Sequence, residues 1–118
     1  MNVRPSLFDK DIVCCIIERE APDMILEALK DRGLGFAIWG EGVETPVVVI
    51  DNRDGLTEDQ LLAIEAHELG HIMTESDVEV DAELYAIALL RLTGHHTAAQ
   101  LLLDRGIVDE CKAAAFTI

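Results

Sequence analysis

The sequence predicts an α+β fold that is mostly helical and contains a short antiparallel β-sheet. The chain has 118 residues and a mass of 13.0 kDa, which suits a single domain over residues 1–118 with one modest hydrophobic core. Half of the residues are apolar and 27% are charged, a composition typical of folded proteins. Apolar residues recur with helical spacing over most of the chain, whereas two short apolar runs flank the turn at residues 40–42, so both element types are expected.

The first third of the chain is predicted to form two helices. Apolar residues between Ser6 and Glu20 fit a helical pattern, and serine is a residue type that caps helices, so we expect a first helix there. A second helix is expected to begin at Pro22, because proline suits the first turn of a helix. It is expected to end at Gly33, since glycine readily adopts the left-handed conformation that closes a helix.

The middle of the chain is predicted to form two antiparallel strands and a helix. Phe36–Trp39 and Pro46–Ile50 are short apolar runs separated by a glycine-containing turn. Because proline lacks the N–H that a central strand would donate, we expect the second strand to lie near the border of the sheet. Thr57 and Gln60 then have the spacing of a capping box, which predicts a largely buried helix from Glu58 to Met73.

The rest of the chain is predicted to be helical. The apolar pattern indicates a buried helix from Val80 to about Thr93 and a final amphipathic helix over Thr97–Asp104. The segment Cys111–Ile118 is apolar for an end segment, so we expect it to pack against the helices or to form a dimer contact. Whether this segment covers a functional cleft is left open.

Charge and cysteine content exclude several classes of protein. Nine Lys and Arg residues against 23 Asp and Glu give a formal net charge of −14, so a phosphate backbone would be repelled and we expect no nucleic-acid partner. The apolar run Ile12–Ile17 is too short for a membrane span or a signal-peptide core, which predicts a cytoplasmic protein without a membrane partner. Adjacent Cys14 and Cys15 with distant Cys111 suit neither a disulfide framework nor a zinc knuckle, so we expect buried or half-buried thiols on a helix.

The segment His67-Glu68-Leu69-Gly70-His71 carries the H-E-x-x-H spacing. Two imidazoles four residues apart leave one face of a helix one turn apart, which suits two ligands of a single Zn²⁺ ion. Glu68 lies beside them, so its carboxylate can take a proton from a zinc-bound water molecule. Burying two imidazoles and a carboxylate without a metal would be costly, and we therefore predict one zinc ion at this helix.

A catalytic zinc site needs a third protein ligand, and several acidic residues follow the motif. Glu79 is favoured because it shares a helical stripe with small side chains such as Ala82, which permit close approach to the first helix. Asp77 is the main rival, since H-E-x-x-H-x-x-G-x-x-D sites use an aspartate six residues after the second histidine. Glu83 and Asp81 are the further alternatives.

The segments Ala66–His71 and Glu79–Ala86 resemble the gluzincin-type zinc metallopeptidases. They are most similar to the ImmA/IrrE family, whose motif is H-E-L-G-H followed by E-x-x-A-[ND]-x-x-A. Position 83 is Glu where the family favours Asn or Asp. The resemblance covers about residues 46–92, the expected metal-binding core of a minimal single-domain version.

This resemblance implies a zincin-like fold and a function. By it, His67, His71 and Glu79 match the zinc ligands, and Glu68 matches the catalytic acid/base. The implied activity is zinc-dependent hydrolysis of peptide bonds, with a protein or peptide as the substrate. The alternative is a non-catalytic, zinc-containing regulatory or protein-binding module of the same fold.

The surroundings of the motif suggest how a substrate would be recognised. The strand Val47–Ile50 is expected to accept an extended peptide as an added strand or, equally, to be an ordinary core strand. The surplus of acidic residues favours basic substrates, or serves only to keep the surface soluble. The sequence leaves the substrate and the existence of a homodimer open.

Overall fold

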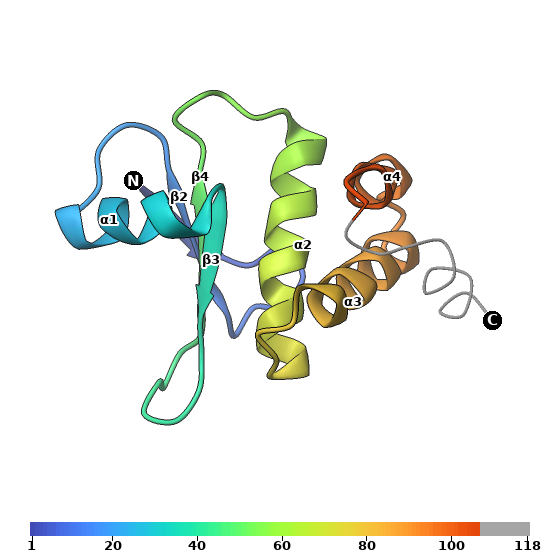
Figure 1. Ribbon diagram of the computed structural model, residues 1–118, viewed down its shortest axis with the longest axis horizontal. Coiled ribbons are helices and arrows are strands. Elements are labelled where there is room, and N and C mark those ends of the chain that lie inside the picture. The colour runs from blue at the N-terminus through green and yellow to red at the C-terminus, as the bar shows by residue number, and fades with distance from the viewer. Residues whose placement is uncertain (107–118) are drawn as a thin grey trace.

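The computed structural model describes residues 1–106, which form a four-stranded sheet and four helices. In chain order the elements are β1 (Asn2–Pro5), β2 (Val13–Ile17), α1 (Asp23–Arg32), β3 (Gly35–Ile38), β4 (Val47–Asp51), α2 (Glu58–Thr74), α3 (Glu79–Leu92) and α4 (His96–Asp104). Helix α1 lies on one side of the sheet, and α2 lies on the other side with α3 and α4 beyond it (Figure 1). The α+β class is confirmed, whereas the segment Cys111–Ile118, which was expected to dock, lies outside the described residues.

The sheet is mixed rather than purely antiparallel. Its strands follow the order β1-β2-β4-β3, with β2 and β4 parallel at the centre and an antiparallel strand on each side. The predicted antiparallel pairing of the two middle strands is confirmed, since Phe36 of β3 lies opposite Val49 of β4. The parallel pair arises because β2 and β4 are joined through α1 and β3, a connection long enough to bring the chain back in the same direction.

The predicted first helix over Ser6–Glu20 is wrong, because its apolar part forms the central strand β2. Cys14 packs with the residues that face α2, whereas its neighbour Cys15 packs with the residues that face α1. A strand covered on both faces needs apolar residues at every position, which produces a continuous run instead of an alternating one. The prediction of buried thiols is confirmed for these two free cysteines, but they lie on a strand and not on a helix.

The prediction that the second strand lies near the sheet border is also wrong. Strand β4 is central, between β2 and β3, so it offers no free edge to a peptide. Pro46 directly precedes the strand, where its missing N–H breaks no ladder, and its carbonyl accepts a hydrogen bond from the Val13 N–H at 3.1 Å. The border strand on this side of the sheet is β3.

The remaining helices form where local signals predicted them. Helix α1 follows Pro22 and ends directly before Gly33, whose positive φ of 83° is a backbone conformation that glycine adopts readily. Both hydrogen bonds of the Thr57–Gln60 capping box are present at the start of α2.

Within residues 1–106, no helix combines the length and the apolar composition needed to cross a lipid bilayer.

A buried carboxylate ties the N-terminal segment to α2. Glu65 has an exposed fraction of 0% and accepts hydrogen bonds from Arg4 Nη2 and Ser6 Oγ, both at 2.7 Å, and from the Leu7 N–H at 2.8 Å. Ser6, expected to cap a helix, instead helps to satisfy this acid. These contacts hold helix α2 against the N-terminal segment two residues before the H-E-x-x-H motif.

Candidate metal centre

The two motif histidines lie in the buried half of α2. All residues from Leu62 to Ile72 are buried, so the imidazoles of His67 and His71 stand in the interior, next to each other on one face of the helix. Their ring centroids are 4.9 Å apart and the ring planes are nearly perpendicular, at 89°. This is the arrangement that the four-residue spacing predicts.

Glu79, the first residue of α3, lies between the two imidazoles. Its Oε2 is 2.8 Å from His67 Nε2 and its Oε1 is 3.2 Å from His71 Nε2. The ligand atoms of these three side chains lie within 4.8 Å of one another, so they could hold a metal ion. Among the predicted candidates for a third ligand, Glu79 is the one that the structure brings to the histidine pair.

The close approach of α3 to α2 depends on Gly70, which lies between the two histidines. A Cβ at this position would overlap the carbonyl oxygen of Ala82 and would lie 2.9 Å from its Cα, so any side chain would push α3 away. Ala82 itself is fully buried at this crossing. The small residues that suggested close packing in the sequence therefore place Glu79 over the histidines.

The other candidate acids have different roles. Asp77 borders the cleft beside the histidines but is not part of the three-residue cluster. Asp81 accepts a hydrogen bond from Ser76 Oγ at 2.8 Å. Glu83 is buried behind His67.

A second set of contacts orients each imidazole. His67 Nδ1 is 2.7 Å from Glu83 Oε1, and His71 Nδ1 is 2.7 Å from the Ser76 carbonyl oxygen. Both oxygens only accept, so both Nδ1 atoms donate. Arg105 Nη2 also lies 3.3 Å from His67 Nδ1, but two N–H groups cannot bond to each other, and Arg105 instead donates to Glu83 at 2.9 and 3.1 Å.

These contacts leave the two Nε2 atoms facing carboxylate oxygens with no proton between them. A neutral imidazole carries one N–H, and in both rings it is used at Nδ1. The lone pairs of both Nε2 atoms then face the oxygens of Glu79, which is unfavourable unless extra protons or a cation lie between them. A divalent ion bound by His67, His71 and Glu79 satisfies all these atoms at once, and the donor set is one that zinc prefers.

The pKa of His67 reflects the same environment. Burial alone lowers the pKa, but the hydrogen bond to Glu83, together with the charges of Glu68 and Glu83, more than offsets burial, so the pKa is raised above its ordinary value. The negative groups that favour the protonated imidazole would also favour a metal cation at this site.

Glu68 differs from His67, His71 and Glu79 because one of its oxygens lacks a partner among residues 1–106. The residue is only 6% exposed, and within residues 1–106 its buried Oε2 has no hydrogen-bond partner. Burial raises the pKa of this carboxyl group, Glu79 adds to the rise, and the charges of His67 and His71 partly oppose it. A basic oxygen is thus held without a partner beside the histidines, as the sequence predicts for a catalytic base.

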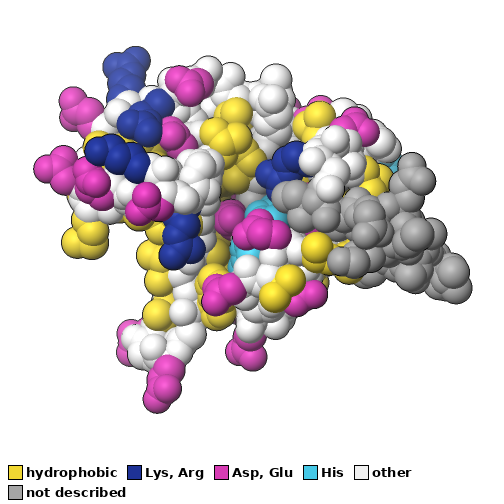
Figure 2. Space-filling model, in the orientation of Figure 1, with side chains coloured by type: hydrophobic (Ala, Val, Ile, Leu, Met, Phe, Trp, Pro, Cys, Tyr) yellow, Lys and Arg dark blue, Asp and Glu magenta, His cyan; other side chains and the backbone are white. Residues whose placement is uncertain are grey.

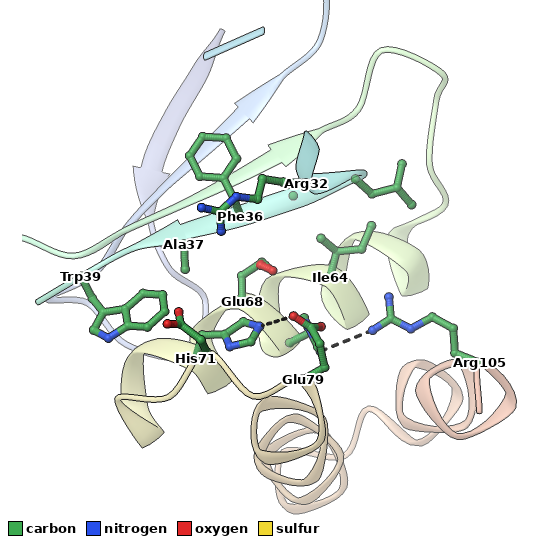
Figure 3. Close-up of a pocket in the computed structure, with 13 residues that line it drawn as sticks. Arg32, Phe36, Ala37, Trp39, Ile64, Glu68, His71, Glu79 and Arg105 are labelled. Atoms are coloured by element: carbon green, nitrogen blue, oxygen red, sulfur yellow. Dashed lines mark hydrogen bonds and ion pairs between the residues drawn. The ribbon is translucent and has the colours of Figure 1, made fainter. Parts of the chain in front are cut away.

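The centre opens into a cleft of about 330 Å³ between β3 and helices α2 and α3. Glu68 projects from α2 toward β3, and His71 and Glu79 lie at the base of the cleft (Figure 3). In the space-filling view, histidine and acidic side chains meet in this hollow (Figure 2). A Cβ on Gly35 would lie 2.7 Å from the Val49 oxygen of β4 and 3.1 Å from Ile64 of α2, so glycine lets β3 lie close to both elements.

Sequence reasoning did not find two residues of this cleft. Trp39, directly after β3, stacks on His71 with ring centroids 5.9 Å apart and an angle of 10° between the ring planes. Arg105 follows α4 and reaches Glu83. Neither residue has a local signal, because each comes from an element far from the motif in the sequence. The position of Glu83 four residues after Glu79 was a usable signal, since it places both acids on one face of α3.

No family model, curated protein or solved structure matches this chain. The resemblance to the gluzincin-type peptidases therefore rests on the motif residues alone.

Proposed function

We propose that the chain is a zinc-dependent peptidase with a zincin-like fold, similar to the ImmA/IrrE family. The observation that supports this most is that all four ring nitrogens of His67 and His71 face oxygen acceptors, with Glu79 between the two Nε2 atoms. His67, His71 and Glu79 would hold the ion. When bound, zinc would polarise the carbonyl of the scissile bond and lower the pKa of a water molecule.

Glu68 is proposed to move the proton during hydrolysis. Its unpartnered Oε2 would accept a proton from the attacking water molecule as the oxygen–carbon bond forms, and would deliver it to the amide nitrogen as the carbon–nitrogen bond breaks. A carboxylate whose pKa is raised by burial binds this proton more readily than an exposed one.

The substrate is proposed to bind as an extended peptide along β3. This strand pairs with β4 on one side, and its residues Gly35, Phe36 and Ala37 border the cleft. An added strand would satisfy the N–H and C=O groups on its other side and would pass over the metal centre. Trp39 would limit the cleft at the end of β3 and hold the ring of His71 by stacking.

Zinc binding is the first test of this function. The purified chain is expected to contain or take up one zinc ion, and saturating zinc at a thousandfold excess over Kd should raise the free energy of unfolding by about 4 kcal/mol. Elemental analysis and thermal denaturation with and without a chelator measure both quantities. A chain that takes up no zinc and gains no stability would overturn the proposal.

A Glu68→Gln variant then separates an enzyme from a non-catalytic module. We expect cleavage of an unfolded protein substrate, followed by mass spectrometry, to fall by about 10²- to 10⁴-fold while zinc content is unchanged. Glu75→Gln, at the exposed end of the same helix, is the matched control and should retain cleavage. If the wild type and the Glu68→Gln variant both contain zinc and have the same biological effect, the chain is the non-catalytic module instead.

A further inference from the structure

Two arginines border the cleft of a strongly acidic protein. The chain has nine Lys and Arg residues against 23 Asp and Glu, yet Arg32 and Arg105 both line the cleft that contains the metal centre. Arg32 is the last residue of α1 and lies on the β3 side, whereas Arg105 follows α4 and lies on the opposite side (Figure 3). Positive groups are therefore placed on both walls of the cleft.

Arg105 is held in place by a buried partner. Its Nη2 donates to both oxygens of Glu83, which has an exposed fraction of 0%, while the side chain of Arg105 itself is 41% exposed. Among the described residues, all its side-chain hydrogen bonds leave from Nη2, so the donors at Nε and Nη1 remain for a bound molecule. An arginine fixed at one nitrogen loses less conformational entropy when it binds a ligand.

Arg32 lies at the cleft without an ion pair among residues 1–106. It also lines the neighbouring hollow, which continues along β3 past Phe36 to Trp39. Its guanidinium therefore stands beside the path proposed for an extended substrate. A planar guanidinium binds carboxylates well, through two parallel hydrogen bonds.

The local charge balance differs from that of the whole chain. Besides Glu68 and Glu79, which compensate a divalent ion, Asp77 is the acid that borders the cleft among the described residues, against two arginines. Counting buried Glu83 as well gives an approximately neutral cleft, whereas the chain as a whole carries −14. The acidic surplus of the chain therefore does not extend to the cleft, and the two arginines are its charged groups that can meet an acidic ligand.

We propose that Arg32 and Arg105 recognise carboxylate groups of the substrate, so that the site takes acidic peptides. This inference rests on the proposed peptidase function and adds the substrate class to it. The carboxylate belongs either to an Asp or Glu side chain near the scissile bond or to the C-terminus of the peptide. Both sources present the same planar group to the guanidinium.

The test measures binding instead of cleavage. Zinc-loaded Glu68→Gln protein is titrated with three pools of random, tryptophan-free nonapeptides whose fixed fifth residue is Glu, Gln or Lys, all with an amidated C-terminus. Binding is followed by the fluorescence of Trp39, the single tryptophan of the chain, which borders the cleft. A fourth pool with central Gln and a free C-terminus tests the other source of the carboxylate.

We expect at least one of the two carboxylate pools, the Glu pool or the pool with the free C-terminus, to bind at least tenfold more tightly than the amidated Gln pool. The Lys pool is expected to bind least tightly. Arg32→Gln and Arg105→Gln should each reduce this preference several-fold, whereas Arg53→Gln, an exposed arginine paired with Asp51, should leave it unchanged. Arg32→Glu, at an exposed position where folding is not at risk, should shift the preference toward the Lys pool.

Equal affinity for all four pools, no binding of any pool, or tighter binding of the Lys pool would overturn the inference. These outcomes are distinct from failure of the peptidase proposal, because binding requires no turnover. A protein that prefers acidic peptides but cleaves none in its wild-type form would keep the recognition and lose the enzyme. A protein that cleaves peptides without this preference would keep the peptidase proposal and lose the proposed recognition of acidic peptides.

Discussion

Glu65 and Glu68 lie one turn apart on α2, and both are buried, but their surroundings differ. Glu65 is completely buried and accepts hydrogen bonds from Arg4, Ser6 and the Leu7 backbone, and it also lies 3.6 Å from the Cys14 thiol. Glu68 is almost as buried, yet its Oε2 has no partner among residues 1–106. One helix therefore presents a satisfied acid to the sheet and an unsatisfied acid to the cleft.

This difference separates a stabilising role from a chemical one. Burying a carboxylate is unfavourable unless hydrogen bonds and an opposite charge compensate it, and Glu65 receives both. Glu68 lacks part of this compensation, so its oxygen stays basic and available to a substrate. We therefore expect mutations at Glu65 to change folding and mutations at Glu68 to change chemistry.

The largest effect on stability is expected for Glu65→Ala. This change leaves Arg4, Ser6 and the Leu7 N–H without their common acceptor and should lower the free energy of unfolding by about 3–5 kcal/mol. Urea denaturation at neutral pH measures the loss. Zinc affinity of the remaining folded protein should be unchanged, and a loss below about 1 kcal/mol would contradict the structural role of this acid.

The helices could be predicted from the sequence because their signals are local. The capping residues Thr57 and Gln60 define the start of α2, and the H-E-x-x-H spacing places both histidines on one face without knowledge of the fold. Glu79 could be favoured because Gly70 and Ala82 allow the next helix to approach. Features that depend on residues within a few positions of one another could therefore be predicted from the sequence.

The central strand and the outer part of the cleft could not be predicted in the same way. The apolar run of β2 is compatible with a buried helix or a buried strand, and only pairing with β4, more than thirty residues away, decides between them. Arg105 and Trp39 reach the cleft from separate elements. Their roles depend on tertiary contacts that no short sequence pattern encodes.

A third buried carboxylate extends the comparison to the candidate metal centre. Glu83 is completely buried like Glu65, but it serves His67 by accepting the Nδ1 hydrogen bond at 2.7 Å. Glu83→Gln keeps the size of the side chain but weakens this contact, so zinc affinity should fall about 10- to 100-fold. Competition with a zinc chelator measures the change, and Glu58→Gln, an exposed acid in the first turn of α2, is the control.

The thiol beside Glu65 provides a pH test of the buried site. Burial first, and then the negative charge of Glu65, raise the pKa of Cys14 to about 12 from an ordinary value of 9.0. Above pH 9 the thiol ionises in the unfolded chain but stays protonated in the folded one. Its contribution to stability is thus complete below pH 9 and is lost as the pH rises toward 12.

The expected result is a loss of about 1 kcal/mol in the free energy of unfolding between pH 9 and pH 10, beyond that of a Cys14→Ala variant. The variant removes the thiol but keeps all other groups that titrate in this range, so the difference between the two curves isolates Cys14. Parallel curves would show that the thiol is not shielded by burial and Glu65 as the structure indicates.

The smallest effect on stability is expected for Glu68→Gln. The change removes a buried charge whose Oε2 has no partner among the described residues, so it breaks no compensated pair. The metal-free variant should unfold within about 0.5 kcal/mol of the wild type, or be slightly more stable, in the same urea experiment used for Glu65→Ala. A loss of several kcal/mol would mean that Glu68 is as strongly compensated as Glu65. It would then be a structural acid, and the assignment of a free basic oxygen at the metal centre would fail with it.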